Sequence, residues 1–468
     1  MKHFYTLSIL CILITFFVSC TDYNEPFFSE TEISADPPVN EITDPTRVNP
    51  NELNRVISDF IIRNSIETAR SMDFEIETVY DSNNNPTLYI VNFANDNGFI
   101  VISASKRYTP IVAYNTYGNF CLNNLTHHDV TEWIEKTIDE ISNAEFVPMD
   151  SIKRVHSQWE QYEAKVLSTF NSHISRSEIS DEDLAELLRI REDSIRTWQL
   201  KGFTVYNADE SIVSDDDLIN NTYWLYYEHA RELAVVVERR ESLIIGVKNS
   251  MKTTWNQTAS YNVSFPILSN GNHAYAGCTT IAAGQVMYYY KHPTYINWAG
   301  MPINSGSKIT SDFLYSLAQK SNPKYNLDGT GISLSDMTST IISFGYNAKH
   351  NNSFDLNLAN SDLNSGKPII VHSEYKDSKG KIQHHAWVVS CRYIDLTRTY
   401  KSIYTFTRFK SLEAFNTRHQ DNTAGPFHYI NWGWGGTYDG YYYNITNVAP
   451  GNNTDGTSLK MIYNISPK

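Results

Sequence analysis

The hydrophobic pattern of the first half of the chain predicts a helix followed by a hairpin. Apolar residues recur at helical spacing after Glu52 and predict a helix of about five turns; they are Leu53, Val56, Ile57, Phe60 and Ile61. Two apolar runs, 88–93 and 99–103, then flank Asn95-Asp96-Asn97-Gly98. Because these four residues tolerate positive φ, the pattern indicates two strands joined by a turn.

A second amphipathic helix is expected shortly afterwards. Asp129 lies three residues before Glu132, which is the spacing of a capping box. The apolar residues that follow share one helical face; they are Val130, Trp133, Ile134, Ile138 and Ile141. Residues 51–145 are therefore predicted to form a small α+β unit.

Residues 146–250 show a mainly helical pattern, with 183–190 and 223–245 as the clearest helical segments. No catalytic grouping stands out in this region. Past Lys248 the acidic runs end, and Gly, Asn, Tyr and Trp become frequent. This change in composition predicts a domain boundary near 245–253 and a second domain over 251–468.

The N-terminus has the pattern of an export signal. Lys2 and His3 precede an apolar run, 4–18, which is short for a membrane span and ends at Ser19-Cys20. A small residue before a Cys resembles the lipobox of bacterial lipoproteins, so we expect residues 1–20 to be a signal and Cys20 to carry lipid. Ordinary export with cleavage near Ser19 is the alternative. Residues 21–50 would then be a polar tether at the cell envelope, on the outer membrane or cell surface.

Composition narrows the class of protein further. The chain has 468 residues, of which 41% are hydrophobic, so we expect more than one globular unit. Lys and Arg number 38 against 52 Asp and Glu, a net charge of −14, which argues against a nucleic-acid binder. With Cys11 in the signal and Cys20 lipidated, the exported body keeps Cys121, Cys278 and Cys391. Three thiols cannot all pair, so one is a candidate for chemistry, and the others are expected to be buried free thiols.

Cys278 is the best-placed thiol for catalysis. It follows Ala276-Gly277 directly and heads a predicted helix that Pro293 closes. The amides at a helix N-terminus stabilise negative charge, so a lowered thiol pKa and a large thiolate fraction are expected. Taken alone, a Cys in this position is more commonly a small buried residue.

A thiolate nucleophile needs an imidazole, and the imidazole needs a group that orients it. His384 and His385 open an apolar strand; His385 shares a face with Trp387, whereas His384 lies at the polar edge. Further on, 427–436 predicts a strand that runs into an aromatic, Gly-rich loop containing Asn431. An Asn there can accept the imidazole N–H, although a tight turn with packed aromatics explains the same pattern.

These motifs together resemble a known family. The order Cys, His, Asn is that of papain-like enzymes. The chain more closely resembles the streptopain family of bacterial cysteine peptidases. The elements that carry this resemblance are Trp255-Asn256-Gln257, Ala276-Gly277-Cys278, 385–389, Asn431-Trp432-Gly433-Trp434-Gly435-Gly436 and Asp439-Gly440-Tyr441. Upstream, 89–114 is similar to the inhibitory prodomain of that family.

The resemblance implies an α+β architecture with a papain-like peptidase domain, made as a zymogen that its own prodomain inhibits. It assigns Cys278 as nucleophile, His385 as acid/base, Gln257 as oxyanion-hole side chain, Asn431 as the group that orients His385, and Trp432 as their shield. It implies protein or peptide substrates, hydrolysis through an acyl-thioester, and neither a cofactor nor a metal. Residues 392–426 are longer and more polar than the family pattern, and 126–245 have no clear counterpart.

Two other function classes remain open at this point. One is a non-catalytic surface lipoprotein whose aromatic C-terminal domain binds peptide or glycan. The other is a thiol-dependent acyltransferase. For the peptidase, we expect the maturation cut within 239–253, where the change in composition coincides with basic residues such as Arg239 and Arg240.

Overall fold

The computed structural model describes residues 46–64, 74–122, 127–160, 162, 180–207, 233–376, 381–406, 411–445 and 458–468. The expected signal, Cys20 and most of the tether lie outside these ranges. Residues 46–50, the end of the expected tether, pack on the N-terminal α+β unit, because Val48 is buried and its N–H donates to the carbonyl of Ala104. No helix in these ranges is long and apolar enough to cross a bilayer.

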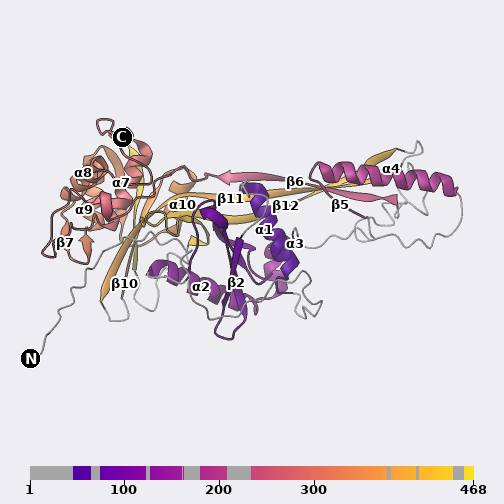
Figure 1. The fold of residues 1–468 in the computed structure, drawn as a ribbon, viewed down its shortest axis with the longest axis horizontal. Helices are drawn as coiled ribbons and strands as arrows, with labels where there is room; N and C mark the ends of the chain where they lie inside the picture. Colours follow the sequence, from indigo (N-terminus) through magenta and orange to yellow (C-terminus); the bar gives the residue numbers. More distant parts are fainter. Residues whose placement is uncertain are drawn as a thin grey trace, which may run out of the picture.

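One antiparallel sheet of 12 strands runs through the molecule (Figure 1). Its order is β1-β2-β3-β4-β13-β12-β11-β10-β14-β9, and β6 and β5 join it through β11. The first four strands are β1 Phe74–Tyr80, β2 Pro86–Phe93, β3 Phe99–Ser103 and β4 Ile111–Asn115. The others are β5 Thr204–Asn207, β6 Val235–Gly246, β9 Tyr346–Asn351, β10 Ile369–Lys376, β11 Ile382–Phe406, β12 Leu412–Asn431, β13 Gly440–Tyr443 and β14 Ser458–Pro467. A separate two-stranded sheet pairs β7 Lys324–Asn326 with β8 Gly329–Gly331.

The N-terminal unit combines β1–β4 with α1 Pro50–Asn64, α2 His128–Ala144 and α3 Lys153–Glu160. The expected first helix is confirmed as α1, and its N-terminus has a capping box between Asn49 and Glu52. The expected hairpin is confirmed as β2 and β3, with positive φ at Asn95, Asp96 and Gly98. A Cβ at Gly98 would lie 2.3 Å from the carbonyl oxygen of Asn115, so only glycine fits there.

The capping box predicted for α2 is wrong. His127 occupies the N-cap position and makes no side-chain cap hydrogen bond. The carboxylate of Asp129 instead accepts from the hydroxyl of Ser373, 2.8 Å away on β10. Asp129 therefore bonds a residue on a distant strand and does not cap its own helix.

The region between the N-terminal unit and residue 250 is only partly helical. The expected helix over 183–190 is confirmed as part of α4, Asp181–Leu200. The expected helix over 223–245 is wrong for 235–245, which form strand β6; residues 208–232 lie outside the described ranges. The run Val235-Val236-Val237 is β-branched, and β5 and β11 pair with β6 on its two sides, so strand pairing overrides the helical pattern.

The polar segment 392–426 forms the outer part of β11 and β12. Together with β5, β6 and α4 it builds a long projection, here called the arm, which extends to the right in Figure 1. The arm therefore combines residues from before and after the boundary expected near 245–253.

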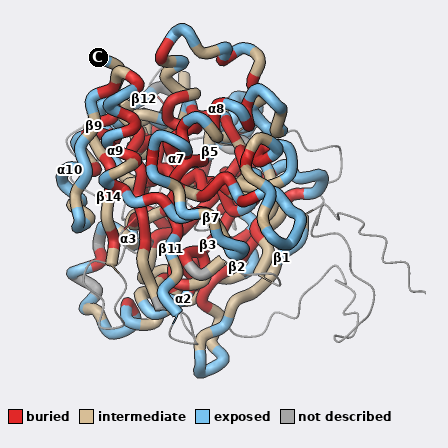
Figure 2. Tube along the Cα trace, turned by 90° about the vertical axis from the view of Figure 1, so that its left-hand side faces the viewer, coloured by how far each residue is buried: buried red, intermediate tan, exposed pale blue. Residues whose placement is uncertain are grey.

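The C-terminal half packs helices against the sheet. They are α7 Cys278–Tyr290, α8 Lys308–Gln319, α9 Leu334–Ser343 and α10 Leu356–Asn364. Helix α7 is buried along most of its length, and Figure 2 shows it among the buried segments at the centre of the molecule. Its neighbours in the core include Trp255, Leu314 and Val388. This mixture of helices with an antiparallel sheet confirms the α+β class.

Candidate active site

The sequence around Cys278 folds as expected, with Cys278 as the first residue of α7. Gly277 precedes it with φ +87°, and a Cβ there would lie 2.8 Å from the carbonyl oxygen of Thr330. Glycine is therefore required for the turn that feeds α7. At the other end Lys291 adopts the left-handed conformation and ends the helix before Pro293.

Strand β11 places His385 beside this helix. The backbone N–H of Ala386, the next residue, donates to the Cys278 thiol. His385 lies near the start of β11, opposite Ser373 of β10, and is buried. The structure thus brings together the two residues predicted to carry the chemistry.

The ring of His385 is held by a backbone carbonyl. Its Nε2 lies 3.1 Å from the carbonyl oxygen of Trp432. Because a carbonyl can only accept, Nε2 carries the proton, and Nδ1 of the neutral ring is left as the basic nitrogen.

Asn431 does not hold His385 in this structure, which corrects the predicted role. Its Oδ1 accepts from Nε2 of Gln285 at 2.8 Å and from the N–H of Gly433 at 3.1 Å. Its Nδ2 donates to the carbonyl of Thr253 at 2.5 Å. Asn431 therefore ties the irregular segment before Trp255 to α7 and to the loop after β12.

Asp439 fixes the residue that holds His385. Its Oδ1 accepts from the N–H of Trp432 at 2.8 Å, and burial raises the pKa of this carboxyl to about 8. The indole N–H of Trp432 donates to the carbonyl of Tyr438 at 3.1 Å. The backbone N–H and the indole N–H of Trp432 are thus both bonded to residues of the same loop. The motif Asp439-Gly440-Tyr441 signalled this residue, but its spacing did not reveal the contact.

Aromatic rings enclose the imidazole. Trp432 is fully buried, and its ring is stacked with that of His385 at 6.4 Å between centroids. Trp434, which the prediction left without a role, lies nearer, at 4.6 Å from His385. The two indoles also stack on each other at 5.3 Å, and together they shield one side of the imidazole from water.

Gln257 lies beside the loop that leads to the thiol. Its carbonyl accepts from the N–H of Ala276, two residues before Cys278. The residue is half-buried, and its side-chain amide makes no hydrogen bond to any described residue. The amide is therefore available to a ligand near Cys278.

The N-terminus of α2 covers this site. The ring of His127 stacks on Trp434 at 3.6 Å, while Asp129 reaches Ser373, the residue opposite His385. One turn further on, Val130 and Trp133 share a buried cluster with Trp387, Trp432 and Tyr442. The sequence had placed these residues on an amphipathic helix without indicating what its apolar face covers.

Burial decides the protonation of the two central groups. Cys278 keeps some exposed surface, but its sulfur lies deep, and desolvation raises the thiol pKa despite donors from Ala386 and Thr279. The expectation of a lowered pKa is therefore wrong for this form of the chain. Desolvation, with a smaller contribution from the nearby His127, lowers the pKa of His385 to about 3. At neutral pH the pair is a thiol and a neutral imidazole, without the ion pair of an active cysteine peptidase.

The remaining candidates lie away from the reacting groups. The side chain of His384 is about half exposed and its Nδ1 lies 3.9 Å from a carboxylate oxygen of Glu374. Cys391 is the buried free thiol that was expected. Cys121 is disulfide-bonded in this unprocessed chain, in place of the buried free thiol that was expected, and with Cys278 and Cys391 free its partner lies outside the described residues.

Two segments of the chain match known protein families. Residues 45–141 match the family model described as Spi protease inhibitor, and residues 255–326 match the Peptidase C10 family. One segment of the chain is thus similar to a family of protease inhibitors, and a later segment, which includes Cys278, is similar to a family of peptidases.

Two solved structures are similar to the chain. Active wild-type interpain A cysteine protease of Prevotella intermedia is 18% identical, with a TM-score of 0.34; the match covers 47% of this chain and 94% of that one. A fragment of prointerpain A from the same organism is 15% identical, with a TM-score of 0.41; the match covers 85% of this chain and 100% of that one. No curated protein matches the chain in sequence.

The raised thiol pKa predicts slow alkylation of Cys278 in the full-length chain at neutral pH. The rate should rise steeply as the pH increases, because only the thiolate reacts. Once the upstream region is removed, the same rate should be reached at a lower pH. Iodoacetamide labelling followed by peptide mass spectrometry measures this, with Cys391, whose thiol pKa burial raises to about 12, as the internal control. Equal rates before and after removal would contradict the prediction.

Proposed function

We propose that the protein is an exported, lipid-anchored zymogen of a bacterial cysteine endopeptidase. The observation that carries this proposal is the contact between Cys278 at the head of α7 and the backbone beside His385, under the first turn of α2. The nucleophile Cys278, the base His385 and the first turn of α2, which covers them, lie next to one another. The hydrogen bond to the Trp432 carbonyl fixes the tautomer of His385.

Cys278 attacks the carbonyl carbon of the scissile peptide bond as a thiolate, after His385 has taken its proton. The oxyanion that forms accepts from the free amide of Gln257 and from the backbone N–H of Cys278. Collapse of this intermediate breaks the C–N bond, and His385 donates its proton to the leaving amine. Water then attacks the acyl-thioester with His385 as base, which releases the acid and restores the thiol.

Positioning falls to the loop after β12. The Trp432 carbonyl holds Nε2 of His385 through both protonation states, since an imidazolium also donates from Nε2. The stacked Trp432 and Trp434 limit the access of water to the imidazole. Asn431 and Asp439 maintain the loop itself.

Latency follows from the same contacts. His127 and Asp129 must leave before a substrate can reach Trp434 and the thiol, because their side chains occupy that space. Their departure also readmits water to Cys278 and His385, which favours the charged forms of both.

Substitutions at the site test the proposed roles. Cys278→Ala should abolish peptide hydrolysis, and His385→Ala should be nearly as damaging, because each group takes part in bond making. Gln257→Ala should lower kcat by roughly 10² to 10³ as the loss of one oxyanion donor. Steady-state kinetics on a peptide library with processed enzyme measure these effects, with His384→Ala as the matched control.

A reversed ranking of His384 and His385 would contradict the assignment. Product analysis after labelling with a peptide-based thiol electrophile separates the rival functions. Transfer of the acyl group to an added amine in preference to water would indicate an acyltransferase. Absence of labelling would indicate a binding protein.

Maturation is proposed to cut the chain between β6 and Trp255. Of the window 239–253, residues 239–246 are paired in β6, which leaves 247–253 as the part outside the strand, with Lys248, Ser250 and Lys252 exposed. If the cut is autocatalytic, Cys278→Ala should accumulate at full length, while the parent yields an active species that begins within 247–254. N-terminal sequencing checks this. An active species whose Cys278-bearing chain begins before 200, or full activity in an uncut chain, would contradict it.

The lipid anchor rests on Cys20, which lies outside the described residues. Wild-type protein should partition into the detergent phase of a Triton X-114 extraction and lose that behaviour on Cys20→Ala. Intact mass spectrometry of the purified protein is the direct measurement. An unmodified wild-type protein recovered in the aqueous phase would refute the anchor.

A further inference from the structure

The arm joins the upstream region to the peptidase through a long strand pair. β6 pairs with β11 at each position from Val235↔Tyr404 to Gly246↔Tyr393. The prodomain sheet, by contrast, meets the peptidase sheet through β4 and β13 at Tyr441↔Tyr114 and Tyr442↔Ala113 alone. The strand connection to the segment 180–246 is thus far more extensive than the one to the prodomain sheet.

Both partners contribute to the apolar interior of the arm. Buried residues from the upstream side pack against the end of the peptidase hairpin; the upstream set is Leu187, Ile195, Val205, Leu233, Val235 and Val237, and the hairpin set is Tyr404, Phe406 and Leu412. Trp198 of α4 also contacts Tyr404, at 4.5 Å between ring centroids. Phe406 is only 2% exposed in this arrangement.

The peptidase part of the arm lacks support without this cover. Residues 394–406 and 412–424 alone would be a two-stranded ribbon, which is marginally stable in water. Loss of β6 would also expose the backbone of β11 along the paired stretch, which is an edge prone to association with other strands.

We propose that the segment 180–246 stays bound to the mature peptidase as a separate chain after the maturation cut. The proposal rests on the proposed maturation at 247–253. With a second hydrolytic cut between residues 162 and 180, the prodomain, 46–162, is released, and the mature enzyme is a two-chain molecule whose arm keeps β5, β6 and α4.

The contacts around the cut allow both new ends to stay in place. Upstream of it, the N–H of Val247 donates to the carbonyl of Arg392 at 2.9 Å. Downstream, the N–H of Asn249 donates to the hydroxyl of Tyr441 at 2.9 Å, and Met251 is buried in the peptidase core. Lys248 and Ser250 are exposed between these anchors.

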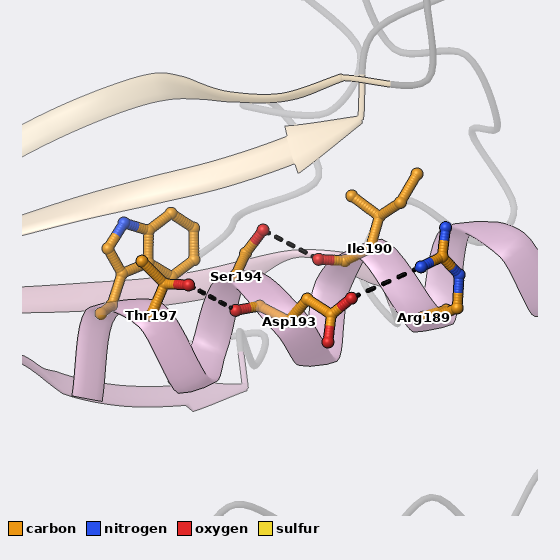
Figure 3. A pocket seen from close by; sticks show the side chains of 6 residues that line it. Arg189, Ile190, Asp193, Ser194 and Thr197 are labelled. Carbon is orange, nitrogen blue, oxygen red and sulfur yellow. Dashed lines mark hydrogen bonds and ion pairs between the residues drawn. The ribbon is translucent and has the colours of Figure 1, made fainter. Parts of the chain in front are cut away.

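Helix α4 lines a hollow of about 310 Å³ (Figure 3). Its polar groups are satisfied on the same helix, with Ser194 donating to the carbonyl of Ile190 and Thr197 to that of Asp193. Arg189 pairs with the carboxylate of Asp193 at 3.6 Å. The hollow therefore offers no free catalytic group, and α4 serves as the cover of the arm.

The test uses the full chain with Cys278→Ala, so that an added site-specific protease makes every cut. One recognition site is inserted between Val247 and Lys248, and a second between Tyr162 and Ser180. After cleavage, size-exclusion chromatography and native mass spectrometry should find 180–247 in complex with 248–468. Separation of these two pieces under native conditions would overturn the proposal.

A matched pair of variants in β6 shows whether strand packing holds the complex. Val237→Asp places a charge at a position that is 4% exposed, and Leu243→Asp places the same charge at one that is 59% exposed. The first should lower the co-eluting fraction of 180–247 at least tenfold, and the second should leave it unchanged. Equal retention in both would count against the packing argument. Since the added protease replaces self-cleavage, an inactive peptidase would refute the proposed function and leave this result interpretable.

Discussion

Strand β11 is the element on which the rest of the structure depends, because it is paired on both sides along most of its length. Near its start it carries His385 between β10 and the head of α7. Further along it lies between β12 and β6, so the same strand supports the arm. The position of the imidazole and the docking of the segment before residue 250 are thus set by one continuous set of backbone hydrogen bonds. At His385 itself β11 is paired with β10, and the carbonyl of Trp432, just past the end of β12, holds the ring, so these two contacts keep the imidazole beside the thiol.

The chemistry of the latent form follows from desolvation. Helix α7 directs its N-terminus at Cys278, which by itself favours a thiolate, yet burial outweighs this effect and raises the thiol pKa. The same burial lowers the pKa of His385. The prodomain therefore blocks access and also removes the charge separation that the reaction needs. Both effects end with one event, the departure of the first turn of α2.

The upstream half of the chain is attached in two different ways. The prodomain contacts the loop that holds His385 through side chains such as His127 and Asn115, the latter donating to the carbonyl of Asp439. The segment 180–246 is attached by strand pairing and a shared apolar interior. The prodomain also shares buried apolar clusters and one short strand pair with the peptidase, so the two attachments differ chiefly in the length of the strand pairing.

The sequence by itself determined the local features. Gly277-Cys278 before an apolar helix, the hairpin around Asn95-Asp96-Asn97-Gly98 and the strand opened by His384-His385 depend on neighbours in the chain, and the structure has them where they were expected. Only the tertiary structure decided the partners. Asn431 bonds Gln285 in place of His385, 235–246 pair with a strand that lies more than a hundred residues later, and the thiol pKa rises because α2 covers it. The spacing of residues along the sequence indicates which chemical groups are present. The hydrogen-bond partners of these groups and their desolvation depend on segments that folding brings together from distant parts of the chain.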